Sequence, residues 1–328
     1  NSQAVTGELD LTDARLTSQT RRILSEILLL DGVSLQTLRT GSKATLSEAR
    51  GDDGVICRAL ETKPKAVTRE WESDFTELSM PDFRAFCRFL SNPETSLHTF
   101  MPGPLGHNDL PDAKALCSAF ADACAENPKC ITGRIVLDDK HDATPYHWGK
   151  RLFASFFEGM ASRRQTPFSP KPSFSLHSLD FSYSKIGDEH IRSLASILVS
   201  NPKAVWHSLN LAATAVSGRS LESLRPWLSM SAVSLSLLSF GHTYHIDDDG
   251  LCALAGAFQE NPVCVAGHLN LLTCSNVSSS GIRVLVDALS AQPGVRLECL
   301  SVQWWTGDGV EDHSHVLTSE GRAESVDE

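Results

Sequence analysis

Residues 176–202 read LHSLDFSYSKIGDEHIRSLASILVSNP and contain one complete unit of a repeating pattern. Leu176, Leu179 and Phe181 are separated by polar residues, as in a strand with one face in a core. A polar turn follows, and apolar residues then recur at helical spacing until Asn-Pro at 201–202. Proline cannot continue a helix and biases the residue before it toward extended backbone. The stretch therefore predicts a strand, a turn and a helix that ends at the proline.

The proline stop recurs along the chain with a regular period. Asn-Pro stands at 92–93, 127–128, 201–202 and 261–262, and Lys63-Pro64 and Gln292-Pro293 occur in matching contexts. The steps between these prolines are 29, 35, 74, 60 and 31 residues, so the two long steps are close to twice the short ones. Strands are predicted at about residues 9, 38, 69, 100, 135, 179, 209, 238, 269 and 300, the seventh beginning as Trp206-x-x-Leu209. A period of this length indicates a solenoid whose stacked units share one core.

The pattern resembles the long leucine-rich repeats of the ribonuclease-inhibitor type. Their consensus LxxLxLxxNxL, followed by a helix with GxxxLxxxL, is matched strongly over 174–303 and more weakly over 35–160. The resemblance implies a right-handed α/β solenoid, or horseshoe, with parallel strands on its concave face and helices on its convex face. We expect about ten repeats in one domain over 1–305, with a Pro-rich loop insertion at 163–173 and a polar C-terminal tail over 306–328.

One consensus position departs from this family. Its asparagine is replaced by Ser184, Thr214, Thr243, Cys274 and Ala14. In the family that side chain bonds backbone groups between coils, so we expect smaller hydroxyls and thiols to take over its role. The first predicted strand also lacks a recognisable capping segment, which leads us to expect a missing N-terminal part.

Composition narrows the classes of function. The chain has 40 acidic and 29 basic residues, a formal net charge of −11, which disfavours charge-driven binding to nucleic acid. Its nine cysteines contain no CxxC pair, which favours reduced thiols in a cytoplasmic protein. No apolar run approaches the roughly 20 residues of a membrane helix.

The turn GHTYHIDDDG at 241–250 carries two histidines and three aspartates, ligand types that suit a divalent cation. Its equivalents in other units, FSYSKIGDEH and LAATAVSGRS, are predicted strand-to-helix turns. We therefore expect the aspartates to cap a helix, Ile246 to fill the core and His242 to face the concave side, with metal binding as the weaker alternative. No catalytic, cofactor or metal site is predicted.

An arginine could still give the repeats a catalytic role. A GTPase-activating protein for the nuclear GTPase Ran is built on similar repeats and uses a loop arginine near its N-terminal coils. Arg15 and Arg39 follow the first two predicted strands, the corresponding place in this chain. No wider motif accompanies them, so this activity is the second hypothesis.

The first hypothesis is a non-catalytic scaffold that binds protein partners on its concave face, as a subunit or adaptor of a cytoplasmic or cytoskeletal assembly. Residues between and just after the strand leucines should face that side. The candidate contacts are Asp10, Asp13, Arg134, Asp138, Asp139, Asp180, Tyr183, Asn210, His242, Asn270, Gln303 and Trp304. Trp304, with the next tryptophan, could equally close the C-terminal end of the core.

Overall fold

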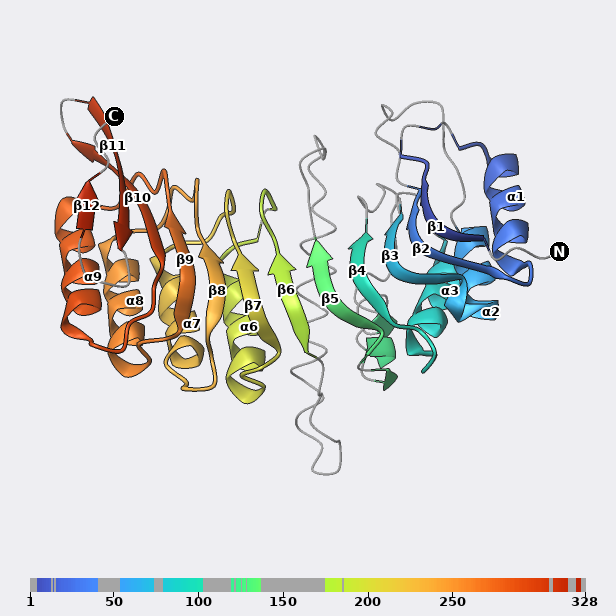
Figure 1. The fold of residues 1–328 in the computed structure, drawn as a ribbon, viewed down its shortest axis with the longest axis horizontal. Coiled ribbons are helices and arrows are strands. Elements are labelled where there is room, and N and C mark those ends of the chain that lie inside the picture. The colour runs from blue at the N-terminus through green and yellow to red at the C-terminus, as the bar shows by residue number, and fades with distance from the viewer. Residues whose placement is uncertain are drawn as a thin grey trace. The chain divides into compact units, whose positions relative to one another are not determined.

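The structure is a computed structural model of the 328-residue chain (Figure 1). It describes residues 5–12, 14, 16–40, 54–73, 79–102, 119–120, 122–124, 126–127, 129–136, 175–184, 186–306, 309–317 and 323–325. The chain divides into two compact units, Asn1–Leu176 and His177–Glu328. The single repeat domain expected over 1–305 stays a prediction.

Unit 1 alternates strands with helices. Its elements are β1 (Val5–Asp10), α1 (Ser18–Leu29), β2 (Val33–Arg39), α2 (Gly54–Thr62), the short 3₁₀ helix η1 (Pro64–Ala66), β3 (Val67–Ser73), α3 (Met80–Ser91), β4 (Leu97–Pro102) and β5 (Ile131–Val136). The five strands pair in parallel in chain order. Trp71, Phe86 and Phe100 lie in its core, where ring centroids stand 5.3–6.2 Å apart.

Unit 2 repeats the same alternation. It contains β6 (Leu176–Asp180), which begins at the unit boundary, α6 (Asp188–Ser200), β7 (Val205–Asn210), α7 (Gly218–Leu228), β8 (Leu235–Ser239), α8 (Asp248–Glu260), β9 (Val265–Leu271), α9 (Ser279–Ala291) and β10 (Cys299–Thr306). Strands β7 to β10 pair in parallel. The predicted class, an α/β solenoid of parallel strands and alternating helices, is confirmed, and all ten predicted strands occur at their expected places.

The C-terminal segment forms strands that the repeat pattern does not predict. Two further strands, β11 (Gly309–Leu317) and β12 (Ala323–Ser325), continue the sheet in antiparallel orientation. In the first pairing Leu300 lies opposite His315, and Thr306 lies opposite Gly309. The segment is mostly polar and has no leucine repeat, so repeat periodicity alone did not predict these strands.

Buried asparagines join successive repeats, and the sequence reasoning missed this role. The Asn261 side-chain amide donates to the carbonyls of Leu228, Met230 and Val233, at 2.8–2.9 Å, in the preceding repeat. In the same way, the Asn127 amide donates to the carbonyls of Leu90, Asn92 and Thr95, in the last turn of α3 and just after it. These bonds satisfy carbonyls that a helix end leaves unpaired. Asn127 and Asn261, each followed by a proline, are thus links between repeats as well as helix ends.

The described cysteines are free thiols, and most of them lie in the core. Eight of the nine cysteines lie in the described segments, all as free thiols, and six of them are buried. Burial raises the pKa of Cys264 and Cys274 to about 12, which keeps these thiols protonated and unreactive.

None of the helices within the described ranges has the length and apolar character that a membrane crossing requires.

Candidate functional site

The strand-to-helix turns of unit 2 share an unusual backbone conformation. Tyr183, Ala213, His242 and Thr273 occupy the same turn position and have φ of 60°, 54°, 58° and 60°. This left-handed region disfavours residues with a Cβ. It is held because the N–H groups of Tyr183, Ala213 and His242 donate to carbonyls of the following repeat at 2.7–2.9 Å. The repeated turn sends the side chains of Tyr183 and His242 into solvent at equivalent places.

Hydroxyl and thiol groups occupy the consensus asparagine position, as expected. Thr243 donates its hydroxyl to the Leu211 carbonyl at 3.3 Å, and Cys274 donates its thiol to the Phe240 carbonyl at 3.4 Å. Both carbonyls belong to the preceding repeat. Ser184 instead bonds a carbonyl three residues earlier in its own repeat, at 2.6 Å. Thr214 likewise bonds a carbonyl of its own repeat, so the inter-repeat role is confirmed for Thr243 and Cys274 only.

The turn GHTYHIDDDG is a helix-capping site. Asp247 is the N-cap of α8, and its carboxylate accepts the Gly250 N–H at 3.0 Å. Asp248 accepts both the N–H and the hydroxyl of Ser278 in the next repeat, at 2.8 and 2.6 Å. Ile246 is fully buried, as predicted. Across the described segments, no group of three or more His, Cys, Asp or Glu side chains is placed to hold a metal ion.

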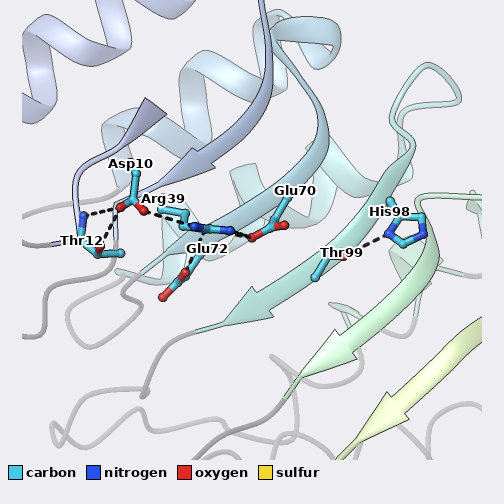
Figure 2. A network of polar contacts seen from close by, with 7 residues as sticks. All are labelled: Asp10, Thr12, Arg39, Glu70, Glu72, His98 and Thr99. Atoms are coloured by element: carbon cyan, nitrogen blue, oxygen red, sulfur yellow. Dashed lines mark hydrogen bonds and ion pairs between the residues drawn. The ribbon is translucent and has the colours of Figure 1, made fainter. Parts of the chain in front are cut away.

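A charged network crosses the strand face of unit 1, and Figure 2 shows Arg39 at its centre. The Arg39 guanidinium lies 3.2 Å from an Asp10 carboxylate oxygen, 2.8 Å from Glu70 and 3.7 Å from Glu72. Strands β1, β2 and β3 supply these side chains, so parallel pairing brings together residues far apart in sequence. The Asp10 side chain is 46% exposed and the Glu72 side chain 31%, which leaves both accessible to a partner.

Hydrogen bonds stabilise the charged forms of Asp10 and Arg39. The Thr12 hydroxyl and N–H donate to Asp10 at 2.6 and 3.0 Å, and with Arg39 they lower the pKa of Asp10 to about 2. Hydrogen bonding to Glu70 raises the pKa of Arg39. Three carboxylates surround one guanidinium, so the network carries an excess of negative charge near neutral pH.

The register of the parallel strands places these residues in two rows that run across the sheet. Asp10, Arg39 and Glu72 are partners along one row, and Glu8, Thr37, Glu70, Thr99 and Arg134 follow one another along the other. Figure 2 shows Thr99 beside His98. The Thr99 hydroxyl oxygen lies 3.1 Å from Nδ1 of His98. We call Glu8, Asp10, Arg39, Glu70 and Glu72 the acidic strand face. It holds four carboxylates and one guanidinium.

The strand ends of unit 2 are polar but nearly uncharged. The Asn210 amide donates to Asp180 at 3.0 Å, and the Asn270 amide donates to the Ser239 hydroxyl at 3.2 Å. The side chains of Asp180, Asn210 and Asn270 each also accept an N–H two residues later, at 3.0–3.1 Å. These side chains are fixed by neighbours and contribute one carboxylate.

An aromatic cluster at the start of β6 and β7 corrects one expectation. The ring centroid of His177 lies 4.6 Å from that of Trp206 and 4.1 Å from that of His207. The repeat pattern aligns Trp206 with the inward-facing Leu176 and so predicts it in the core, yet it is 51% exposed. Val205, one residue earlier, is 1% exposed and fills the core position instead. A smaller β-branched side chain fits inside this strand, and the tryptophan turns outward.

The predicted contacts fall into four groups. Asp10, Arg134, Tyr183 and His242 are exposed, and Asp180, Asn210 and Asn270 are held by hydrogen bonds. Gln303 and Trp304 lie on β10, opposite Asp312 and Glu311 of β11. Asp13, Asp138, Asp139 and Arg15 lie outside the described residues. Glu72, which sequence reasoning omitted, joins Arg39 because of strand register. Partner binding on the concave face stays a prediction.

Comparison with known proteins finds similarity only to solved structures. No protein-family model matches the sequence, and no curated protein matches it. Among solved structures, the chain is similar to one described as Leiomodin-1 Actin-Binding Site 2, with 13% identity and a TM-score of 0.37. The similarity covers 56% of this chain and 90% of the other. At this level it bears on neither partner nor activity.

Proposed function

We propose that the protein is a non-catalytic protein-binding scaffold of the ribonuclease-inhibitor-like leucine-rich-repeat type, and that its acidic strand face recognises a basic segment of a partner. The observation that carries the proposal is the charge of this face. Asp10, Glu70 and Glu72 contact the Arg39 guanidinium, Glu8 lies on the same strand face, and the side chains of Asp10 and Glu72 are partly exposed. Such an excess of one charge on an ordered surface suits a partner rich in Lys or Arg.

The geometry of the face supports recognition rather than general attraction. The carboxylates are fixed on paired strands, and Arg39 and Thr12 hold Asp10 in place by hydrogen bonds. A partner therefore meets preorganised charges and loses less side-chain freedom on binding. Phosphate backbones would be repelled, so the proposed partner is a protein. We place it in a cytoplasmic or cytoskeletal assembly, in which this chain is a subunit or adaptor.

Charge reversal on the acidic strand face tests the proposal. The purified protein serves as bait in cell extract at low salt, beside Glu72→Lys and a control variant, Glu222→Lys. Glu222 is exposed on α7, away from any strand. The expected result is a set of proteins bound by wild type and control, released by moderate salt and lost with Glu72→Lys. Equal binding by all three baits would refute a role for this face.

Arginine-finger catalysis is the alternative function. A finger must leave its own surface and enter the nucleotide site of a partner. The Arg39 guanidinium is held by Asp10, Glu70 and Glu72, so its extension would leave three carboxylates without this counter-charge. That cost supports the non-catalytic proposal. A GTP hydrolysis assay with Ran tests the alternative, which predicts an acceleration that disappears in Arg39→Ala or in Arg15→Ala.

A further inference from the structure

Two buried thiols lie side by side where one repeat of unit 1 ends. The Cys130 thiol donates to Sγ of Cys124, and the two sulfur atoms are 3.6 Å apart. Cys124 has helical backbone, and Cys130 directly precedes the first residue of β5. The two residues are 6% and 2% exposed. The pair therefore connects a helical segment to the strand that follows it.

The turn between the two cysteines recurs in other repeats, which allows their positions to be aligned. In four repeats, the N–H of the residue three places after the asparagine donates to the asparagine carbonyl at 2.9–3.0 Å. This residue is Thr95, Cys130, Ala204 or Cys264, and each is at most 2% exposed. The position of Cys130 is therefore one for a small, buried side chain.

The position of Cys124, three residues before the asparagine, holds a larger side chain in the other three repeats. Phe89, Leu198 and Phe258 occupy it, and all are fully buried. The Thr95 hydroxyl donates to the Phe89 carbonyl at 2.5 Å, so the two aligned positions lie in direct contact in that repeat as well. Among these four aligned repeats, one has cysteine at both positions. The smaller Cys124 leaves room for the two sulfurs to approach each other.

The distance and the connectivity of the pair favour a covalent bond. The sulfurs of a disulfide are about 2.05 Å apart, so each sulfur must move by roughly 0.8 Å from its present place. Asn127 lies between the two cysteines in sequence, and its amide donates to three carbonyls at the end of the preceding repeat. A disulfide would therefore close a short loop around the asparagine that links the two repeats.

We propose that Cys124 and Cys130 are a redox-active pair, which a low-molecular-weight disulfide such as oxidised glutathione converts to an intramolecular disulfide. The Cys130 sulfur, as its thiolate, attacks one sulfur of the reagent, whose S–S bond breaks and releases one thiolate. Cys124 then loses its proton, and its sulfur displaces the second small thiol from Cys130. The two cysteine protons end on the two released thiols, so the protein loses two hydrogens as the reagent is reduced.

The surroundings of the pair set the order of the steps and the rate of the reaction. Hydrogen bonding to Cys130 and burial raise the pKa of Cys124, so this thiol keeps its proton while its partner reacts. Both sulfurs are shielded from solvent, so the reagent reaches them when the turn opens locally. The pair therefore responds to a sustained change in the thiol–disulfide balance. Once formed, the disulfide fixes the turn that holds Asn127 and stabilises unit 1.

Peptide mapping of the whole chain, after equilibration with oxidised or reduced glutathione, tests the proposal. Trypsin cuts after Lys129, so the disulfide joins the peptide 115–129 to the peptide 130–134. The first peptide also contains Cys117, and fragmentation shows which of its two cysteines carries the bond. The expected result is a link from Cys124 to Cys130 in the oxidised sample, which is absent from the reduced sample.

The aligned repeats supply the variants for a second measurement. Cys130→Ala introduces the residue type of Ala204, and Cys124→Phe introduces that of Phe89 and Phe258, so both should fold. Cys264→Ala is the matched control, because Cys264 is aligned with Cys130 in a repeat that has no second cysteine at the facing position. Oxidation should raise the thermal unfolding midpoint of unit 1 by about 3–6 °C in wild type and control, and should leave it unchanged in the other two variants.

Three outcomes would overturn the proposal. The first is that wild type forms no linked peptide in an excess of oxidised glutathione. The second is that Cys130 pairs with Cys87 or Cys117, or still forms an intramolecular link in Cys124→Phe. The third is an equal rise of the unfolding midpoint in wild type and Cys130→Ala, which would assign the stabilisation to a different thiol. Circular dichroism of the reduced proteins confirms the folding of each variant, and Cys130→Ala alone carries the comparison if Cys124→Phe unfolds.

Discussion

The strand faces of the two units differ sharply in charge although the units share one repeating frame. In unit 1 the face carries Glu8, Asp10, Glu70 and Glu72, and the last three contact Arg39. In unit 2 the corresponding strand ends offer amides and hydroxyls that bond each other, with Asp180 as the carboxylate among them. The comparison teaches that buried leucines and asparagines define the frame, while the exposed positions are free to specify different surfaces.

The largest expected effect tests whether the frame is truly shared. Asn127→Ala and Asn261→Ala should each lower the free energy of unfolding of its unit by about 2–3 kcal/mol, because each leaves three buried carbonyls with fewer partners. Denaturant unfolding measures the change. Asn276→Ala, in an exposed turn, is the control and should cost little. A loss below about 0.5 kcal/mol in one unit would break the equivalence of the two frames.

The positions of the strands were predictable because they repeat along the sequence. The orientation and the contacts of several strand side chains were not. Leucines and prolines at a period of about thirty residues located even the weak strand at Val67–Ser73. The same reasoning placed Trp206 inside, since it cannot tell which of two neighbouring apolar residues turns inward. It also missed Glu72, whose role depends on parallel register with Arg39. Capping by Asp247 was predictable, because a cap is a local interaction.

The second prediction sharpens the contrast in charge. Once a partner is purified, Glu72→Lys should weaken its binding about tenfold or more, since it replaces an attraction by a repulsion. Asn270→Lys puts the same new charge on the strand face of unit 2 and should change binding less than threefold. Titration calorimetry at two salt concentrations measures both variants. Equal losses would show that both faces, rather than the acidic one, contact the partner.

The third prediction concerns a carboxylate of unit 2 that has a structural role. Asp188 accepts hydrogen bonds from the N–H and hydroxyl of Ser217, at 2.8 and 2.7 Å, and from the Ser220 hydroxyl at 2.6 Å. Desolvation raises the pKa of Asp188, but these bonds to the next repeat outweigh it and hold the pKa below its usual value.

A lowered folded-state pKa means that the unfolded chain takes up the proton first as pH falls. The stability due to Asp188 is therefore present above about pH 4 and is lost as pH falls through the folded-state pKa. Asp188→Asn should cost about 1 kcal/mol at pH 7, allowing for partial exposure, and should lose less stability on acidification than wild type. Urea unfolding at pH 7, 4 and 3 measures this. If the free energies of unfolding of wild type and Asp188→Asn fell equally with pH, Asp188 would not be a source of the acid sensitivity.

The smallest expected effect is a gain, and it tests the left-handed turns, which the described residues show only in unit 2 for residues other than glycine. Ala213 has φ of 54° because its N–H must reach the Gly241 carbonyl of the next repeat, at 2.7 Å. Glycine adopts this conformation without a Cβ penalty, although it also gains freedom in the unfolded chain. Loss of the Cβ penalty should outweigh the added freedom of the unfolded chain. Ala213→Gly should therefore raise the free energy of unfolding by about 0.5 kcal/mol. Ala215→Gly, two residues on without a positive φ, should lower it. Thermal and urea unfolding measure both signs, and a loss in both variants would mean that the inter-repeat bond, rather than strain, dominates the turn.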